Sequence, residues 1–291
     1  LNSGGDVTIT GTSSGTGNSG VNFNGGNVRV FGNNVTINAT ANTASGQTGF
    51  GFRSVIGPGA GNTITAAGNL FITGTVNGAG SGTAVFHTST SWQNLVNAYT
   101  TGGNLSITGS NNAFASNTSP TITMAGVQAR AGGDLTVSAT TNNAATDAIS
   151  IYSASYLSGG VAPGYQGGAS SLASTSGDVM LQTNQGGILF NDGVPNNVTP
   201  TTLSGRNISI DNTGGTVSAG IISAPGVLTM NGGAGVRLNS TGGINASSGL
   251  NIFGKSTVAS GVLVQETLTA GSDINVVGTA GGAATTGAYI A

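Results

Sequence analysis

A short turn-and-strand unit recurs along the whole chain, and it constrains the fold more than any other feature of the sequence. In residues 102–109, two glycines precede Asn104 and the alternating stretch Leu105–Thr108, and another glycine follows. Glycine and asparagine adopt turn conformations readily, and the alternation directs Leu105 and Ile107 to one face of a strand. A unit built on a short strand and repeated roughly every 20 to 50 residues indicates a solenoid.

The copies of this unit share an Asn or Asp immediately before the strand, and we expect that residue to form the turn. These turn residues are Asp6, Asn27, Asn69, Asn104, Asp134, Asp178, Asn207 and Asp273. We expect the apolar residues that follow them to form the structural core: Val7, Ile9, Val28, Val30, Leu70, Ile72, Leu105, Ile107, Leu135, Val137, Val179, Leu181, Ile208, Ile210, Ile274 and Val276. Exchange of Asn and Asp at one repeat position is typical of a turn rather than of a catalytic role.

A second apolar strand follows each unit in the first part of the chain, at a nearly constant offset. Val21–Phe23 follows Val7 in this way, and Ile122–Met124 follows Leu105. We interpret the second strand as another wall of the same coil. Strands that cannot bury a face alone stack on copies above and below them. The sequence therefore predicts an all-β parallel β-helix (β-solenoid), with about 13 coils of about 20 residues each.

We expect one continuous rod in which two stretches differ in regularity. Residues 1–168 are predicted to form coils with longer loop excursions. Residues 169–291 are predicted to form smoother and tighter coils, because most apolar strand centres there recur at short and nearly regular intervals. No composition shift in the chain suggests a linker between domains.

One excursion has a helical pattern. Trp92, Leu95, Val96 and Tyr99 occupy positions i, i+3, i+4 and i+7, and Ser91 could cap such a helix. The spacing predicts a short helix packed on the rod. An exposed contact element that contains Trp92 and Tyr99 is the alternative.

The composition excludes several classes of function. Charged residues make up 5% of the chain and the net charge is −2, so there is no electrostatic basis for binding nucleic acid or an anionic membrane. The chain has no cysteine for a disulfide or thiolate metal site, and no apolar run of roughly 18 residues predicts a membrane span. Alternating apolar residues favour an ordered fold over low-complexity disorder.

The ionisable residues form no recognisable catalytic motif. Acidic side chains are scattered along the chain without an Asp-x-Asp doublet, and His87 is the only histidine. Residues 232–237 resemble a calcium-binding nonapeptide but carry Arg237 where that motif needs Asp. We therefore expect no catalytic residues, no metal site, no cofactor and no enzymatic activity.

The repeated Gly-Gly-Asn-Leu-x-Ile-Thr-Gly strand, followed by a polar link and a strand such as residues 20–26, resembles filamentous-haemagglutinin-like exoproteins of two-partner secretion. The resemblance covers nearly the whole chain and rests on the style of the repeat. It implies a right-handed parallel β-helix at the outer surface of a Gram-negative bacterium or outside it. It also implies a role in attachment, aggregation, biofilm formation or toxin delivery. The family's amino-terminal secretion signature is not found, so we expect an interior repeat segment.

These observations favour a structural or adhesive stalk or filament segment of a secreted or surface-anchored adhesin. Its expected partners are further coils of the same or neighbouring chains, and host or bacterial surface glycans or proteins. A carbohydrate-binding or polysaccharide-cleaving β-helix is the alternative, and it would show an acidic or aromatic groove on one face. A third hypothesis, a threonine-rich ice-binding face, is disfavoured because Thr8–Thr10, Thr63–Thr65 and Thr121–Thr123 are irregularly spaced.

Overall fold

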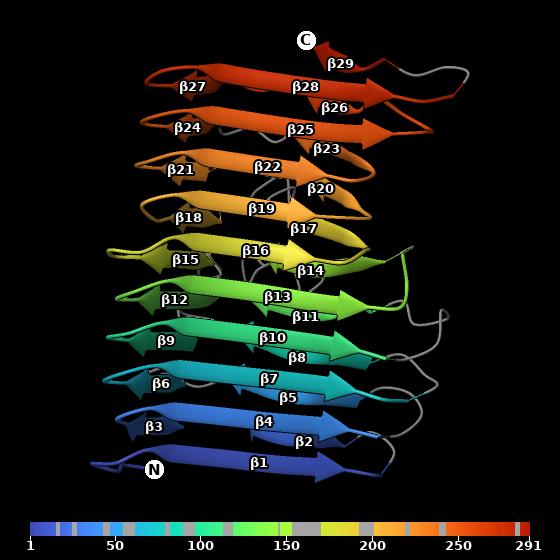
Figure 1. Ribbon diagram of the computed structural model, residues 1–291. Coiled ribbons are helices and arrows are strands. Elements are labelled where there is room, and N and C mark those ends of the chain that lie inside the picture. Colours follow the sequence, from blue (N-terminus) through green and yellow to red (C-terminus); the bar gives the residue numbers. More distant parts are fainter. Residues whose placement is uncertain are drawn as a thin grey trace, which may run out of the picture.

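The computed structural model is a rod of stacked β-coils (Figure 1). The structure describes residues 1–15, 18–24, 28–42, 47–54, 62–78, 82–89, 97–112, 119–144, 146–152, 170–191, 201–218, 222–238, 243–282 and 286–291. Every helix or strand assigned within these ranges is a β-strand, and every pair of neighbouring strands is parallel. The predicted all-β parallel β-helix is therefore confirmed.

Sheet 1 contains ten strands, one from each coil, and forms the front face in Figure 1. Its strands are β1 (Val7–Ser13), β4 (Val35–Ala41), β7 (Leu70–Val76), β10 (Leu105–Asn111), β13 (Leu135–Thr141), β16 (Val179–Thr183), β19 (Ile208–Asn212), β22 (Leu228–Gly232), β25 (Leu250–Ser256) and β28 (Ile274–Ala280). Their order in the sheet is their order in the chain, so each coil lies directly on the preceding one.

Sheet 2 also has ten strands and lies behind sheet 1. They are β2 (Ser19–Asn24), β5 (Gln47–Ser54), β8 (Gly82–Ser89), β11 (Ile122–Ala125), β14 (Asp147–Tyr152), β17 (Gly187–Asn191), β20 (Thr216–Ser218), β23 (Gly235–Leu238), β26 (Val262–Val264) and β29 (Ala288–Ile290). In the register of this sheet, Val21 pairs with Phe50, and Val85 pairs with Ile122. The predicted second wall of each coil is thus confirmed.

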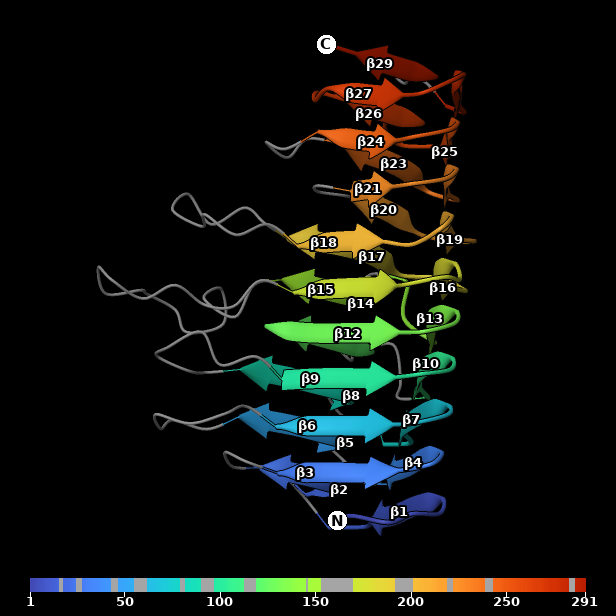
Figure 2. The same cartoon turned by 90° about the vertical axis from the view of Figure 1, so that its left-hand side faces the viewer.

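The third wall is divided between two sheets that form one column in Figure 2. Sheet 3 contains β3 (Arg29–Gly32), β6 (Thr63–Ala66), β9 (Asn97–Thr101), β12 (Val127–Ala131), β15 (Ser171–Ser174) and β18 (Thr202–Ser204). Sheet 4 continues the column with β21 (Ile222–Ala224), β24 (Ile244–Ala246) and β27 (Leu268–Ala270). The sequence analysis predicted only two walls for each coil, and the third wall is a correction.

The coil is right-handed. In Figure 1, the strands of sheet 1 point from left to right across the front, and the chain rises from the N end to the C end. In Figure 2, which shows the left side of that view, the strands of sheet 3 point towards sheet 1.

The coils become shorter towards the C end. The starting residues of the sheet 1 strands lie far apart from Val35 to Val179 and closer together from Ile208 to Ile274. The predicted coil length of about 20 residues therefore holds only near the C end. Because the other coils are longer, the rod has ten coils rather than the larger number expected from the sequence.

The core lies between the sheets and consists of apolar rows along the rod. Alternation in β10 buries Leu105 and Ile107 and leaves Ser106 half-buried on the outer face. Eleven of the sixteen predicted core residues are buried and expose 2% of their surface or less: Val30, Leu70, Ile72, Leu105, Ile107, Leu135, Val137, Val179, Leu181, Ile208 and Ile210. Val7, Ile9, Val28 and Val276 are half-buried, and Ile274 is exposed. The buried side chains form one contiguous cluster that extends through the coils.

The end coils are more open than the coils between them. Val7 and Ile9 of the first coil are half-buried, and so is Val276 of the last. Ile274 is 46% exposed, although its partner in the register, Leu250, is fully buried. The difference arises because each end coil has a neighbour on one side only.

One copy of the repeat was assigned to the wrong strand. Val28 precedes β3 and Val30 lies within it, so both belong to sheet 3. In the register, Val7 pairs with Val35, and the residue equivalent to Asp6 is therefore Asn34. Asn27 lies outside the described residues.

Candidate interaction face

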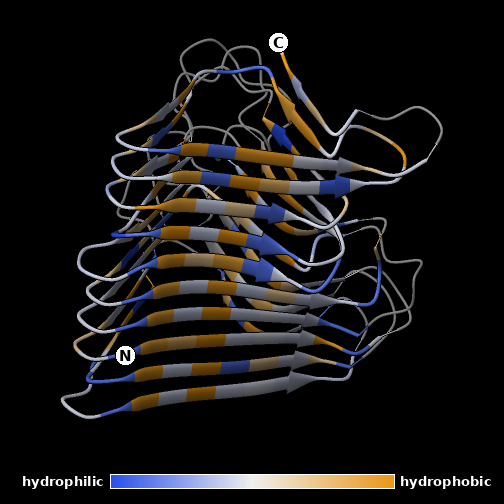
Figure 3. Ribbon diagram, turned by 45° about the horizontal axis from the view of Figure 1, so that its top comes forward, coloured by the Kyte–Doolittle hydropathy of each residue, from blue (hydrophilic) through white to orange (hydrophobic). Residues whose placement is uncertain are grey.

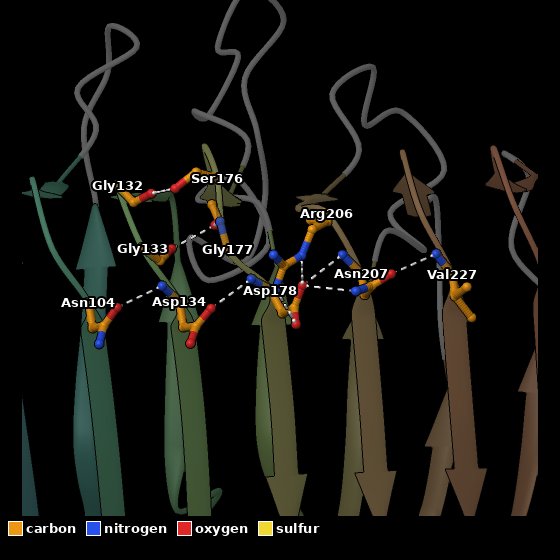
Figure 4. A network of polar contacts seen from close by, with 11 residues as sticks. Asn104, Gly132, Gly133, Asp134, Ser176, Gly177, Asp178, Arg206, Asn207 and Val227 are labelled. Atoms are coloured by element: carbon orange, nitrogen blue, oxygen red, sulfur yellow. Dashed lines mark hydrogen bonds and ion pairs between the residues drawn. The ribbon is translucent and has the colours of Figure 1, made fainter.

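A ladder of Asn and Asp side chains runs along one edge of sheet 1 (Figure 4). The Oδ1 atom of Asn104 accepts the backbone N–H of Asp134 at 2.9 Å, and Oδ1 of Asp134 accepts that of Asp178 at 2.9 Å. The same bond joins each coil to the next, at 2.9–3.1 Å, through Asp6, Asn34, Asn69, Asn104, Asp134, Asp178 and Asn207, and it ends on the N–H of Val227.

This ladder supplies a hydrogen-bond acceptor for the backbone N–H group of the turn residue in the next coil. The carbonyl oxygen of Asp134 accepts the N–H of Leu105 at 2.9 Å, so that side of the peptide is already paired. The N–H of Asp134 is the donor that the Asn104 side chain accepts. Carboxylate and amide oxygens both accept hydrogen bonds, which explains why Asn and Asp exchange here. Six of the eight predicted turn residues thus belong to one structural ladder, while Asp273 follows the break at Val227.

The charges at the ladder stabilise it locally. Arg206 pairs with Asp178 through Nε to Oδ1 at 2.9 Å and Nη2 to Oδ2 at 3.1 Å. This hydrogen bond lowers the pKa of the Asp178 carboxyl below its ordinary value, assisted by the backbone N–H of Asn207. The Asn34 side chain likewise lowers the pKa of Asp6. Both carboxylates accept backbone bonds, and we assign them to the turns.

A second asparagine ladder lies at the opposite ends of the sheet 1 strands. Nδ2 of Asn77 donates to Oδ1 of Asn42 at 3.0 Å, and Nδ2 of Asn112 donates to Oδ1 of Asn77 at 2.8 Å. The sequence analysis did not identify this ladder. Its members have the same spacing along the chain as Asn34, Asn69 and Asn104, so the common interval was the signal that could have revealed it.

The outer face of sheet 1 carries a regular array of hydroxyl groups on its first five strands. We call these fifteen outward positions the hydroxyl grid, and thirteen of them are Thr or Ser. The columns of the grid are Thr8, Thr36, Phe71, Ser106 and Thr136; Thr10, Asn38, Thr73, Thr108 and Ser138; and Thr12, Thr40, Thr75, Ser110 and Thr140. Every position is exposed or half-exposed, and none carries a charge.

The three Thr-Ile-Thr segments considered in the sequence lie on different walls. Thr8–Thr10 belongs to sheet 1, Thr63–Thr65 to sheet 3, and Thr121–Thr123 begins the sheet 2 strand β11, where Thr123 is buried. The irregular spacing of these segments predicted that they would not form one array, and they do not. The array that does form is built from residues that the register aligns.

The outer face of the last five strands is mixed and hollowed. A shallow depression of about 440 Å³ is lined by Asp211, Asn231, Phe253, Lys255 and Val277, among others. A second depression, of about 230 Å³, lies between Asp211 and the fifth strand, where Gln182 and the grid members Ser138 and Thr140 line it. Figure 3 shows this difference as more hydrophilic segments in the C-terminal strands of the front sheet. Acid, amide, cation and aromatic groups meet at these depressions.

The single histidine is a core residue. His87 in β8 and Tyr99 in β9 are both fully buried, and Tyr99 Oη lies 2.6 Å from His87 Nδ1. Burial lowers the pKa of His87 to about 3 and raises that of Tyr99 well above its ordinary value, so both rings are neutral. Tyr99 stacks on Phe52 with ring centroids 5.1 Å apart.

The predicted helix and the alternative, an exposed aromatic contact element, are both wrong at Tyr99. This residue lies in a strand rather than a helix and faces the core rather than solvent. Packing against the aromatic rings of neighbouring coils explains its position. The other residues of the predicted helix, Ser91, Trp92, Leu95 and Val96, lie outside the described residues.

One carboxyl near the C end is unusual. Burial raises the pKa of Glu266 to about 7, while Oε2 accepts the Gly243 N–H at 3.1 Å. Within the described ranges, no group of three or more His, Cys, Asp and Glu side chains could hold a metal ion. The same part of the chain contains no helix long and apolar enough to cross a membrane.

No protein-family model, no curated protein and no solved structure matches this chain. The function is therefore argued from the rod, its ladders and its outer face.

Proposed function

We propose that this chain is a structural and adhesive segment of an extracellular filament, of the kind found in surface-anchored or secreted bacterial adhesins. The observation that carries the proposal is the unbroken parallel stacking of ten coils in register along sheets 1 and 2. Parallel coils joined by backbone bonds on every wall form a stiff, quasi-one-dimensional element. Such an element suits a stalk that holds other parts of a protein away from a cell.

The side-chain ladder supports the same role. It joins eight coils through seven Asn and Asp side-chain oxygens, in addition to the backbone bonds of the sheet. The open end coils would bind further coils of the same polypeptide or of a neighbouring chain, because edge strands have unpaired backbone groups that favour such pairing. We assign no catalytic activity to the chain, and we place it at the outer surface of a Gram-negative bacterium or outside the cell.

A carbohydrate-binding role is the second candidate, and the depression beside Phe253 favours it. The ring is 37% exposed, and the Asp211 carboxylate and Lys255 ammonium line the same hollow. An apolar surface with a few polar groups around it is typical of small-molecule sites. This role is compatible with adhesion through surface glycans.

Electron microscopy of the purified chain tests the stalk proposal. Ten coils at a spacing of about 4.8 Å predict a rod on the order of 45 Å long, and filaments are expected to lengthen as the protein concentration rises. Beads coated with the chain should adhere to cells or immobilised surface glycans more than beads coated with unfolded Leu105→Asp protein. Compact particles with no adhesion would contradict the proposal.

Glycan arrays and polysaccharide digestion distinguish the second candidate. Phe253→Ala should abolish glycan binding if the hollow is the site, while Phe71→Ala on the same sheet face serves as the matched control. Release of oligosaccharides that depends on a single carboxylate such as Asp211 would show that an enzyme, rather than a stalk, is the correct description.

A further inference from the structure

The hydroxyl grid has a repeat in two directions. Parallel pairing places Thr8 beside Thr36, and Thr108 beside Thr73, in the same row of the sheet. Neighbouring strands lie ~4.8 Å apart, and residues i and i+2 of a strand lie ~6.7 Å apart. The outward side chains of five coils therefore form a nearly rectangular lattice. Figure 1 shows the strands that carry it stacked at even intervals.

The lattice is held rigidly. Ten of its fifteen members are threonines, whose branched side chains have restricted χ1 angles. Beneath them, inward residues such as Ile37 and Ile107 are fully buried. The Asn and Asp ladder joins all five strands at one end, and the second ladder joins β4, β7 and β10 at the other. The positions of the hydroxyls are thus fixed by the backbone, and little side-chain entropy remains to be lost on binding.

The grid hydroxyls have few partners within the protein. Among the residues that the structure describes, Ser138 is the one grid hydroxyl that forms a hydrogen bond, which it accepts from Nε2 of Gln182 at 3.2 Å. Each hydroxyl can donate one bond and accept two. The remaining hydroxyls must therefore bind water, and the lattice imposes its own two-dimensional order on that water.

We propose that the hydroxyl grid binds an ordered water lattice and so adsorbs to ice. Faces of ice crystals present oxygen atoms in two-dimensional rows with repeats comparable to those of the grid. A hydroxyl lattice can replace one layer of such oxygens, while the threonine methyl groups occupy the spaces between them. This role is independent of the proposed stalk function, because a rod can fail to bind ice and still form filaments.

The chemistry of the grid disfavours other ligands. None of the fifteen positions is charged, so the grid offers no ion pair to a charged protein or an acidic glycan. Phe71 is its one aromatic member, whereas sugars and protein partners are commonly bound by several aromatic side chains. A water lattice needs only what the grid supplies, which is neutral donors and acceptors at regular intervals.

Slow growth of ice from a solution of the purified chain tests the proposal. We expect the wild-type chain to be incorporated into the ice and to shape the crystals seen by microscopy. Thr108→Tyr places a bulky ring in the middle column of the grid and should reduce incorporation to the level of a protein that does not bind ice. Thr229→Tyr, at an outward position of β22 outside the grid, should leave incorporation unchanged.

Completing the lattice provides a gain-of-function test. The double variant Asn38→Thr and Phe71→Thr fills the two irregular positions and should increase ice incorporation. Thermal melts verify that each variant is folded. Exclusion of the folded wild-type chain from ice would overturn the proposal, as would equal losses in Thr108→Tyr and Thr229→Tyr. Sedimentation with crystalline cellulose or chitin that requires Thr108 would assign the grid to a polysaccharide instead.

Discussion

The first five coils and the last five coils of the rod share one interior but differ in their outer faces. Inside, Ile107 in β10 and Ile252 in β25 occupy the same row, and both are buried. Outside, the first five sheet 1 strands carry the hydroxyl grid, whereas the last five carry Asp211, Lys255 and Phe253 around shallow hollows. The interior is constrained by stacking in every coil, while the outer face can vary without changing the fold.

The coils also differ in length along the rod, and the Asn and Asp ladder is missing from the last two. Sheet 1 strands begin at Leu70 and then at Leu105 in the first half, but at Leu228 and then at Leu250 in the second, so the later coils are shorter. The Asn and Asp ladder ends at Val227, where the short coils begin. Short coils therefore stack through backbone bonds alone at this edge, as in the bond from Leu228 N–H to the Gly249 carbonyl, 3.0 Å long.

The largest expected effect tests whether a buried charge destabilises the middle coils and the end coils equally. Leu105→Asp in a middle coil buries a charge without a partner and should lower the free energy of unfolding by about 3–5 kcal/mol. Ile274→Asp in the last coil should cost about 0.5 kcal/mol or less, because its side chain is already 46% exposed. Denaturant unfolding measures both. Ser106→Asp, on the outer face, is the matched control, and a loss equal to that of Leu105→Asp would contradict the alternation.

A smaller effect is expected where the backbones of two walls approach closely. A Cβ at Gly74 would overlap the carbonyl oxygen of Ala84 in sheet 2. Gly74→Ala should therefore destabilise the first half by about 1–3 kcal/mol. Gly249→Ala, where the nearest neighbouring atom would be 3.7 Å away, is the control in the second half. Similar melting temperatures for both variants would show that this approach does not constrain the fold.

The ladder distinguishes the coils up to Val227 from the last two by about 1 kcal/mol. Asn104→Ala removes the acceptor for the Asp134 N–H, and the loss of one hydrogen bond near the surface should cost about 1 kcal/mol. Val227→Asn should extend the ladder to the N–H of Gly249 and stabilise the rod by about 0.5–1 kcal/mol. Thermal unfolding of the two variants and their combination measures these changes. A destabilising Val227→Asn would show that the short coils cannot accommodate the ladder.

An effect of similar size is a pH dependence near the C end. The folded pKa of Glu266 is raised to about 7, so its contribution to stability is fully present below its ordinary pKa and is lost as the pH rises through about 7. Because the side chain is half-buried, we expect a loss of about 1 kcal/mol. Glu266→Gln should remove this dependence between about pH 4.5 and about pH 8. Asp6 and Asp178, whose pKa values are lowered, should instead lose their contributions on acidification.

The sequence determined the parts of this fold that depend on local chemistry. Alternation in segments such as Leu105–Thr108 assigned residues to the inner and outer faces, because successive side chains of a strand point in opposite directions. Asn and Asp at positions such as 104 and 134 identified the turns, because both residues favour turn conformations. The nearly constant offset between two apolar strands predicted a second wall. These features depend on neighbours in the chain.

Only the tertiary structure decided how the coils align. The excursions between walls vary in length, so sequence spacing assigned Val28 and Val30 to the wrong sheet and left the third wall unseen. Parallel pairing instead joined Val7 to Val35, because that register buries an apolar side chain in every coil between the two end coils. The same pairing placed Tyr99 beside His87 in the core and aligned Thr8, Thr36 and Thr136 on one face. Columns of this kind arise between residues far apart in the chain, and stacking rather than local propensity produces them.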